Sequence, residues 1–473
     1  MTNTGASKIG LYLLDRLTDR FPVVIPRFFQ RTFIGLLGSE FIFRLVWWKY
    51  QRQWRLAKIR SEYSISKILL IVDICIGDTV LWAQCMRVLQ SHFPNAEIHY
   101  ACNRTGGELI AAMPNVTVHN IIQGQRGMPT AVDLQELKNV IERESSSLIF
   151  NLSPFIPQKT LTYRLSRLRA FQIYVPFAAY VTRAWKRGGE RHVSYLSRQF
   201  FDSFLNAAKH SGGEYIEKER TIDLNANMVY LDRESVSAAE NFFADNQIVS
   251  DSGVVMFNPD ATSAYGQMPF DVQSQLLRSI ARMPEVSKVL IGKAYTSKGI
   301  EERLLSKIAP EWKHKFVLIP HVPLPVYTAM IDLSDMFISS DTGPLHIASC
   351  WKARSLDGSS LRNRTAVIAI YGATDSRMYG YDSSASEHTP SNQSAPSRSF
   401  TAPVPCRNIS CINKFGKSCS QVRCFDRLPV DRVLMYISSY FQSTDRLRAG
   451  HESDVIPSSD LLSITIPERV YTT

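Results

Sequence analysis

The sequence predicts an α/β protein made of two doubly wound domains, and three observations support this fold class. The chain has 473 residues, too many for one ordinary hydrophobic core. Strands and helices are expected to alternate in two separate series along it. Each series contains short, continuous apolar runs, such as residues 68–72 and 254–257, which are typical of parallel strands buried on both faces. With 45% hydrophobic and 21% charged residues, the composition is that of a folded globular protein.

The first series occupies residues 66–215 and begins with a strand at residues 67–73. The pattern then predicts a helix at 79–91, strands at 96–101 and 116–119, a helix at 131–144, a strand at 147–152, and helical segments at 160–169 and 193–209. A polar stretch at residues 212–227 joins this domain to the next.

The second series occupies residues 228–430, and a C-terminal helix and tail follow at 431–473. Its predicted elements are helix 233–246, strand 254–258, helix 270–282, strand 286–291, helix 298–308, strand 316–319, helix 326–333, strand 336–339, a helix after residue 343, and strand 365–371. The polar segments 352–364 and 381–403 are expected to be surface loops, the second of them mobile and beside the ligand cleft. Two facing domains of this kind bind ligands at the carboxyl ends of their strands.

Residues 1–65 are expected to form a basic, amphipathic extension. Residues 1–66 hold eleven Lys or Arg against four Asp or Glu, and so supply +7 of the formal charge of +11. Glu40 and Arg44 interrupt the apolar stretches, so none approaches the roughly 20 residues that span a bilayer. The layout of a signal peptide is missing as well. Basic residues interleaved with Phe and Trp favour a helix lying on an anionic membrane; a helix packed on the main body is the alternative.

The eight cysteines fall into two groups. Those in apolar segments indicate reduced thiols and hence the cytoplasm; they are Cys75, Cys85, Cys102 and Cys350. The others cluster near the C-terminus, and they are Cys406, Cys411, Cys419 and Cys424. Their inner spacing exceeds that of most zinc sites, so a structural role without metal is favoured, and structural zinc is the alternative.

A strand runs into a helix at residues 340–346, Ser-Asp-Thr-Gly-Pro-Leu-His. Gly343 lets the backbone approach a ligand, and Pro344 suits the first turn of a helix. The N–H groups and the positive dipole end of such a helix form an anion site.

Three side chains of this turn are candidate ligand contacts. Thr342 adds a hydroxyl donor, and His346, one turn into the helix, can donate to a phosphate oxygen. Asp341 would repel phosphate, so we expect it to accept hydrogen bonds from sugar hydroxyls. The alternative is an Asp or Thr that only caps the helix.

A second turn follows the first strand. Gly77 permits a tight turn there, and Asp78 is expected at the start of the next helix. A carboxylate at the carboxyl end of a strand can take a proton from an attacking hydroxyl, so Asp78 is a candidate general base. An N-cap aspartate is the alternative.

Two further strand ends carry polar residues. Thr262 and Ser263 follow the strand 254–258 and can donate hydroxyls to phosphate, while an ordinary polar loop explains them equally well. Gly372, Thr374 and Asp375 follow the last strand, at the rim of the expected cleft.

These four segments, in this order, resemble the heptosyltransferase family of inverting glycosyltransferases (glycosyltransferase family 9), which adds sugars to lipopolysaccharide cores. The resemblance covers residues 66–430. Its most specific parts are Asp-Thr-Gly-Pro-Leu-His at 341–346 and Tyr-Gly-Ala-Thr-Asp at 371–375. The turn Ile-Gly-Asp-Thr-Val at 76–80 strengthens it.

The resemblance implies a GT-B fold, with the acceptor held mainly by the first domain and a nucleotide-sugar by the second. In the family, the residue matching Asp78 is the proposed general base. The residues that contact the donor sugar and diphosphate match Asp341, Thr342, Gly343 and His346. The resemblance also implies transfer without a metal or another cofactor, because the helix N-terminus and neighbouring donors stabilise the departing diphosphate.

Two segments depart from the family pattern. Gly266 occupies the place of a basic residue, so a phosphate-binding cation is missing unless Lys293 or Arg377 replaces it. The family's Gly-Gly strand end with an acidic donor contact is altered to Ile-Gly-Lys-Ala-Tyr at 291–295. These departures leave the donor sugar open.

The leading hypothesis is an inverting, metal-independent glycosyltransferase that moves a sugar, with heptose as one candidate, to a lipopolysaccharide or other envelope polysaccharide acceptor. Its expected partners are a nucleotide-sugar donor, a lipid-linked or polysaccharide acceptor and, through residues 1–60, the inner face of the cytoplasmic membrane. Nucleic acid is not expected, because no recognition motif accompanies the charge. The alternatives are a catalytically inactive GT-B homologue that binds or scaffolds at the membrane, and another GT-B family that uses UDP-sugars.

Overall fold

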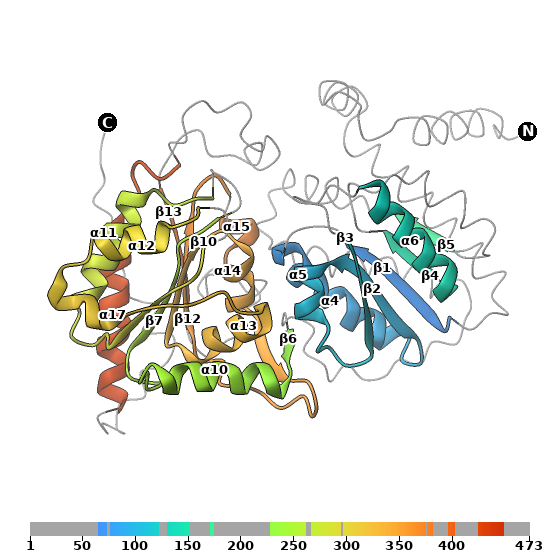
Figure 1. Ribbon diagram of the computed structural model, residues 1–473, viewed down its shortest axis with the longest axis horizontal. Helices are drawn as coiled ribbons and strands as arrows, with labels where there is room; N and C mark the ends of the chain where they lie inside the picture. The colour runs from blue at the N-terminus through green and yellow to red at the C-terminus, as the bar shows by residue number, and fades with distance from the viewer. Residues whose placement is uncertain are drawn as a thin grey trace, which may run out of the picture. The chain divides into compact units, whose positions relative to one another are not determined.

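The computed structural model describes the residues 65–72, 76–122, 130–146, 148–151, 171–174, 228–261, 266–294, 297–374, 376–381, 396–402 and 424–448 (Figure 1). They divide into two compact units. The first unit runs to Val236 and also includes the segments 323–325 and 350–361. The second unit holds the rest, so the chain crosses between the units several times. Each unit contains its own parallel sheet, as the sequence predicts.

The sheet of the first unit has five strands in the order β3-β2-β1-β4-β5. They are β1 (Lys67–Val72), β2 (Glu97–Asn103), β3 (Val116–Ile122), β4 (Leu148–Asn151) and β5 (Phe171–Tyr174), and all neighbours pair in parallel. The chain starts in the middle at β1, winds outward to β3, and returns to β4 on the other side. This doubly wound order has its switch point between β1 and β4.

Three described helices belong to this sheet, namely α4 (Ile76–His92), α5 (Arg104–Ile110) and α6 (Ala131–Glu144). A capping box starts α6: the Thr130 hydroxyl accepts from the Asp133 N–H, and the Asp133 carboxylate accepts from the Thr130 N–H. Leu137, Val140 and Ile141 of this helix pack on one face of the sheet. Their 3–4 residue spacing is that of a single helix face, as the pattern predicts.

The sheet of the second unit has six strands in the order β13-β12-β10-β7-β8-β9. They are β7 (Val254–Asn258), β8 (Lys288–Ile291), β9 (Phe316–Leu318), β10 (Met336–Ser340), β12 (Ala366–Tyr371) and β13 (Ser397–Thr401). Read from β7 outward, this is the doubly wound order again, with its switch point between β7 and β10. The predicted fold class is confirmed for both units.

The described helices that belong wholly or mainly to the second unit are α10 (Arg233–Asp245), α11 (Phe270–Ala281), α12 (Ile300–Ser306), η2 (Pro310–Lys315), α13 (Leu324–Leu333), α14 (Gly343–Ala348), α15 (Ser376–Tyr379) and α17 (Val430–Arg448). The last of these buries Val433, Ile437 and Phe441 in the core. In Figure 1 the long red helix α17 lies on the same side of the sheet as α11.

A third sheet, of two strands, departs from the sequence prediction. β6 (Met228–Leu231) pairs in parallel with β11 (Trp351–Arg354), although residues 352–364 were expected to form a surface loop. Lys352 in this strand is fully buried, and its ammonium group donates to the Cys350 carbonyl at 2.8 Å. A lysine is a poor sequence signal for a buried strand, because its burial is tolerable only where acceptors such as this carbonyl compensate the charge.

Two other predicted boundaries differ from the structure. α4 begins at Ile76 rather than residue 79, so Asp78 is its third residue and does not cap it. β13 occupies residues 397–401 of the segment 381–403, which was expected to be a loop throughout. The expected helices 160–169 and 193–209 and the extension 1–64 lie outside the described residues. Within the described part of the chain, no helix combines the length and apolar character needed to cross a membrane.

Candidate functional site

The candidate site lies at the switch point of the second sheet. β7 and β10 are neighbours in it, with Asn258 opposite Ser339 near their carboxyl ends. Helices that follow neighbouring strands at a switch point leave on opposite sides of the sheet, and ligands bind in the crevice that this creates. The turn at residues 341–342 and the helix α14 follow β10 directly, so the sequence motif 340–346 occupies this position.

Asn258 connects the ends of the two strands. Its side-chain Nδ2 lies 3.0 Å from the Asp260 carbonyl, 3.0 Å from Ser339 Oγ and 3.2 Å from Thr342 Oγ1. One amide nitrogen has only two protons for these three acceptors, so two of the acceptors share one proton. Because Asn258 and Ser339 are buried, this network fixes the shape of the turn before any ligand binds.

The Thr342 hydroxyl is part of the same network. Ser339 Oγ donates to the Ser340 carbonyl at 2.8 Å, and it lies 2.9 Å from Thr342 Oγ1. With the serine proton used in this way, the threonine donates to Ser339. Thr342 occupies the N-cap position of α14, but its side chain makes no capping bond. The hydroxyl therefore braces the turn, and phosphate contact would require its proton to be redirected.

His346 lies in α14, one turn beyond the Gly343-Pro344 start that the sequence predicts. Its side chain is almost completely buried. Nδ1 lies 2.8 Å from the Tyr381 hydroxyl, and Nε2 forms an ion-pair contact of 3.5 Å with Asp341 Oδ1. If the tyrosine donates to Nδ1, the ring proton is on Nε2 and points at the carboxylate. The motif thus brings Asp341 and His346 together at one end of the sheet.

Tyr381 is the site residue that sequence reasoning missed. It is 1% exposed, although it begins the Ser- and Pro-rich segment expected to be a mobile loop. Tyr379 adds a second aromatic ring, edge-on to His346 at 6.3 Å, while the Tyr381 ring lies at 5.7 Å. Burial of a tyrosine whose hydroxyl finds a partner is ordinary, but the partner is 35 residues away and no local pattern identifies it.

The loop after β7 is held by Gln267. Its Oε1 accepts from the Ala261 N–H at 2.8 Å, and its Nε2 donates to the Pro259 carbonyl at 2.7 Å. Asp260 accepts from the Ser297 N–H at 3.1 Å, which joins this loop to the segment after β8. Gly266, where the family has a basic residue, is buried.

Lys293 was one candidate replacement for that basic residue. Its ammonium group forms an ion pair with the buried Glu301 and lies 3.3 Å from Glu302. The hydrogen bond with Glu301 raises the pKa of Lys293 above its ordinary value. Two carboxylates already compensate this charge, so it is less suited to attract a diphosphate. The side chain of Arg377, the other candidate, lies outside the described residues.

The remaining predicted residues are distributed as follows. Gly372 and Thr374 follow β12, the neighbour of β10, and so lie at the same edge of the sheet as the 341–346 turn. Gly77 and Asp78 lie in α4 of the first unit, directly beyond the carboxyl end of β1. Thr262, Ser263, Asp375, Cys406, Cys411, Cys419 and the side chain of Asp78 lie outside the described residues. Cys424 is buried in the core of the second unit.

Two of the cysteines expected to be reduced thiols are fully buried. Cys102 lies in β2, and Cys350 directly precedes β11. Burial raises the pKa of Cys102 and of Cys350 to about 12. Such thiols stay protonated at neutral pH and are poor nucleophiles, so neither is a candidate catalytic group.

Solved structures share this architecture and identify the fold. The chain is similar to a glycosyltransferase of family 9 from Veillonella parvula, with a TM-score of 0.56 and 13% identity over 80% of this chain and 98% of that one. It is also similar to E. coli ADP-heptose LPS heptosyltransferase II, with a TM-score of 0.53 and 13% identity over 80% of this chain and 99% of that one. Both similarities show the GT-B fold.

One family model matches part of the sequence. Residues 218–411 match the model of glycosyltransferase family 9 (heptosyltransferase), and this range includes the 341–346 turn. None of the curated proteins matches the chain in sequence. Residues 218–411 therefore match family 9, the family of glycosyltransferases that the motifs resemble.

Proposed function

We propose that the chain moves a sugar from a nucleotide-diphosphate sugar to a lipopolysaccharide or other envelope polysaccharide acceptor, with inversion at the anomeric carbon. The observation that carries this proposal is the preformed turn 341–346 at the switch point of a family 9 domain. A solved relative is named for ADP-heptose and lipopolysaccharide, which supports heptose as the first donor to test.

The proposed donor contacts follow from the geometry of the turn. The start of α14 presents backbone N–H groups at Gly343 and beyond, and the network around Asn258 holds them in place. A diphosphate placed here would receive these donors as charge develops on it during transfer. Asp341 is 17% exposed and so can accept from a sugar hydroxyl. No metal or other cofactor is required by this arrangement, and transfer is proposed to be metal-independent.

Asp78 is proposed as the general base that deprotonates the acceptor hydroxyl. Its support is its place beyond the carboxyl end of β1, in the first turn of α4, the position expected for a carboxylate that takes a proton from a bound hydroxyl. We further propose that residues 1–65 attach the enzyme to the inner face of the cytoplasmic membrane, because their net charge of +7 attracts anionic lipids.

A single assay separates the proposed enzyme from an inactive homologue. Full-length chain is incubated with a panel of ADP- and UDP-sugars, with and without EDTA, and release of the nucleotide diphosphate is measured. We expect turnover with one donor class, unchanged by EDTA. We expect Asp78→Asn to lower turnover by at least about a hundredfold while donor binding persists.

The matched control is Asp271→Asn, since Asp271 also lies in the first turn of a helix but is exposed in the second unit. We expect it to leave turnover unchanged. Full activity of Asp78→Asn would refute the base assignment. Donor binding without turnover of any donor would instead identify a binding or scaffold protein.

A further inference from the structure

A group of polar side chains replaces the apolar core at one end of the first sheet. In β1, β2 and β3, the residues facing α6 are Leu69, Ile71, Ala101 and Ile121. Side chains alternate between the faces of a strand, so Lys67, Glu97, His99 and His119 lie on this same face. His99 is only 3% exposed, in a position where an apolar residue would pack without cost.

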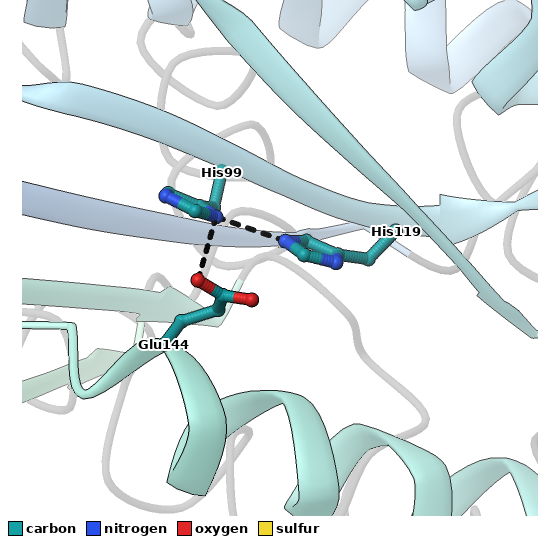
Figure 2. A group of neighbouring side chains, drawn as sticks. All are labelled: His99, His119 and Glu144. Carbon is teal, nitrogen blue, oxygen red and sulfur yellow. Dashed lines mark hydrogen bonds and ion pairs between the residues drawn. The ribbon is translucent and has the colours of Figure 1, made fainter.

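Figure 2 shows how two of these side chains meet the end of α6. His99 Nδ1 lies 2.9 Å from His119 Nε2 and 3.7 Å from Glu144 Oε2. One ligand atom from each of the three residues lies within 4.8 Å of the other two. The two imidazole rings are nearly parallel, at 9°. Three metal-ligand atoms thus converge on one point from β2, β3 and α6.

We propose that His99, His119 and Glu144 bind a transition-metal cation of the zinc type. Zinc binds imidazole nitrogen and carboxylate oxygen at about 2.0–2.2 Å, which places tetrahedral ligands roughly 3.3–3.5 Å from one another. The distances of 2.9 and 3.7 Å are each within a few tenths of an ångström of this separation. Mg²⁺ and Ca²⁺ prefer all-oxygen sites, so the two imidazoles favour zinc over either.

The other side of His99 supports the assignment independently. Glu97 Oε2 lies 3.5 Å from His99 Nε2, and Lys67 holds that carboxylate at 3.3 Å. A histidine that binds metal through one nitrogen commonly donates its other N–H to a carboxylate, which fixes the ring and strengthens the ligand. Glu144 is the last residue of the 14-residue α6, where the negative end of the helix dipole favours a cation.

Two neighbouring cations compete with a metal for these ligands, and Arg143 must move before the metal binds. Arg143 Nε lies 2.9 Å from Glu144 Oε1, and its Nη2 lies 3.5 Å from His119 Nδ1. When Nε2 of His119 binds a metal, the ring proton is on Nδ1 and repels this guanidinium. Lys67 Nζ lies 3.6 Å from Glu144 Oε2. Arg143 is 57% exposed and can turn to solvent, so it competes with the metal instead of blocking it.

The position of the site assigns it a structural role. Lys67 and Glu97 are the first residues of β1 and β2, so the cluster lies towards the amino ends of the strands. Asp78 follows the carboxyl end of β1, at the opposite edge of the same sheet. A metal at this site would join β2 and β3 to α6 and stabilise the first unit, without contact to the proposed base.

The test measures Zn²⁺ binding to the full-length chain under reducing conditions. The variants are His119→Gln, Glu144→Gln and Arg143→Ala, and His314→Ala is the control, because His314 is an exposed histidine of the second unit. Zinc bound per chain is measured after dialysis, affinity by competition with a chromophoric chelator, and unfolding by thermal denaturation. The cysteines and other histidines contribute equally to every variant, so the differences report this site.

We expect the wild type to bind one zinc more than His119→Gln and Glu144→Gln, or to bind it at least about tenfold more tightly. Arg143→Ala should bind more tightly than the wild type, and His314→Ala should equal it. Zinc should raise the unfolding temperature of the wild type more than that of His119→Gln. Co²⁺ should give a visible spectrum at this site without thiolate charge-transfer bands.

Equal zinc content, affinity and thermal shift in the wild type, His119→Gln and Glu144→Gln would overturn the proposal. If His119→Gln fails to fold, Glu144→Gln decides alone, because the Glu144 side chain lies at the end of α6, is 15% exposed and keeps its shape in the amide. These readouts do not depend on sugar transfer, so the metal site can fail while the proposed function stands, and the reverse.

Discussion

His346 lies between a buried tyrosine hydroxyl and a carboxylate, and removal of the hydroxyl is the smallest change that tests the site. We predict that Tyr381→Phe weakens binding of the nucleotide-sugar by about three- to thirtyfold, because a buried hydrogen bond to Nδ1 is lost and the ring is no longer fixed. Calorimetric titration of the donor measures this. Tyr440→Phe removes a partly buried hydrogen bond, 3.3 Å from its hydroxyl to the Asp335 carbonyl, and should leave donor affinity unchanged. If Tyr381→Phe and Tyr440→Phe bind the donor with equal affinity, Tyr381 does not contribute to the donor site.

Protonation of His119 should lower stability in a defined pH window. Burial, and then the neighbouring His99, hold the pKa of His119 below its ordinary value of 6.5. Glu144 and Glu136 act in the opposite direction, and Arg143 adds to the lowering. A folded-state pKa below the unfolded one means that this contribution is complete above the unfolded pKa and is lost as the pH falls through the folded one.

We therefore predict that, with a chelator present, the free energy of unfolding of the first unit decreases as the pH falls below the ordinary histidine value of 6.5. Denaturant titrations at several pH values measure it. The neighbouring carboxylates act in a separate window: hydrogen bonds from Lys67 and Arg143 lower the pKa of Glu97 and Glu144 below 4.5, so their contribution is lost only in more acidic solution. His119→Gln should flatten the upper window and leave the lower one. A profile identical to the wild type would contradict this prediction.

Among the helices and strands, α17 makes the most direct prediction. Phe441 on its inner face is fully buried, whereas Met435 on its outer face is 56% exposed. We predict that Phe441→Ala lowers the free energy of unfolding by about 3–5 kcal/mol, because it removes apolar burial and leaves a cavity. Met435→Ala should change it by less than about 0.5 kcal/mol. Chemical denaturation followed by tryptophan fluorescence compares them, and similar losses would show that α17 is not part of the core.

Helices and strands differ in how well the sequence alone predicts them. β1, β7, β10 and β12 each contain a continuous apolar run, because both faces of a central parallel strand are covered. β13 lies at the sheet edge with the polar sequence Ser-Arg-Ser-Phe-Thr, and only its pairing with β12 makes it a strand.

α5 was missed for a related reason. Its sequence contains Gly106 and Gly107, which disfavour a helix by about 1 kcal/mol each relative to alanine. Tertiary packing demands them: a Cβ at Gly106 would lie 2.6 Å from Thr79 Oγ1, and one at Gly107 would collide with Asn120. Contacts with distant residues, not local preference, select both glycines.

The residues of the candidate site also differ in how well the sequence alone predicts them. Asp341, Gly343 and His346 could be predicted because they lie within one short motif, in which strand, turn and helix start are encoded side by side. Asn258 lies 83 residues before Asp341, and Tyr381 lies 35 residues after His346. Only folding brings these two residues to the motif. The bracing role of Thr342 also depends on Ser339, whose proton has a competing acceptor that the sequence does not reveal.

For the whole molecule, the basic extension makes a prediction about the membrane. We predict that full-length chain sediments with vesicles containing phosphatidylglycerol, and that a chain beginning at Ser64 does not, because the extension supplies the excess of +7. Raised salt should release the full-length chain, since screening weakens the attraction. Vesicles of phosphatidylcholine alone are the control. Equal sedimentation of the two chains would show that the extension does not bind the membrane.

The strand pair β6–β11 has a consequence for exchanging parts between related enzymes. Both strands come from the part of the chain that matches family 9, yet they belong to the first unit, where β6 contacts α4 and α5. A chimaera joined at residues 227/228 would place this pair against helices with which it did not evolve. A breakpoint chosen by sequence alone therefore cuts through a packed contact, and a hybrid that keeps its stability has to carry the matching surfaces of α4 and α5 with residues 228–231 and 351–354.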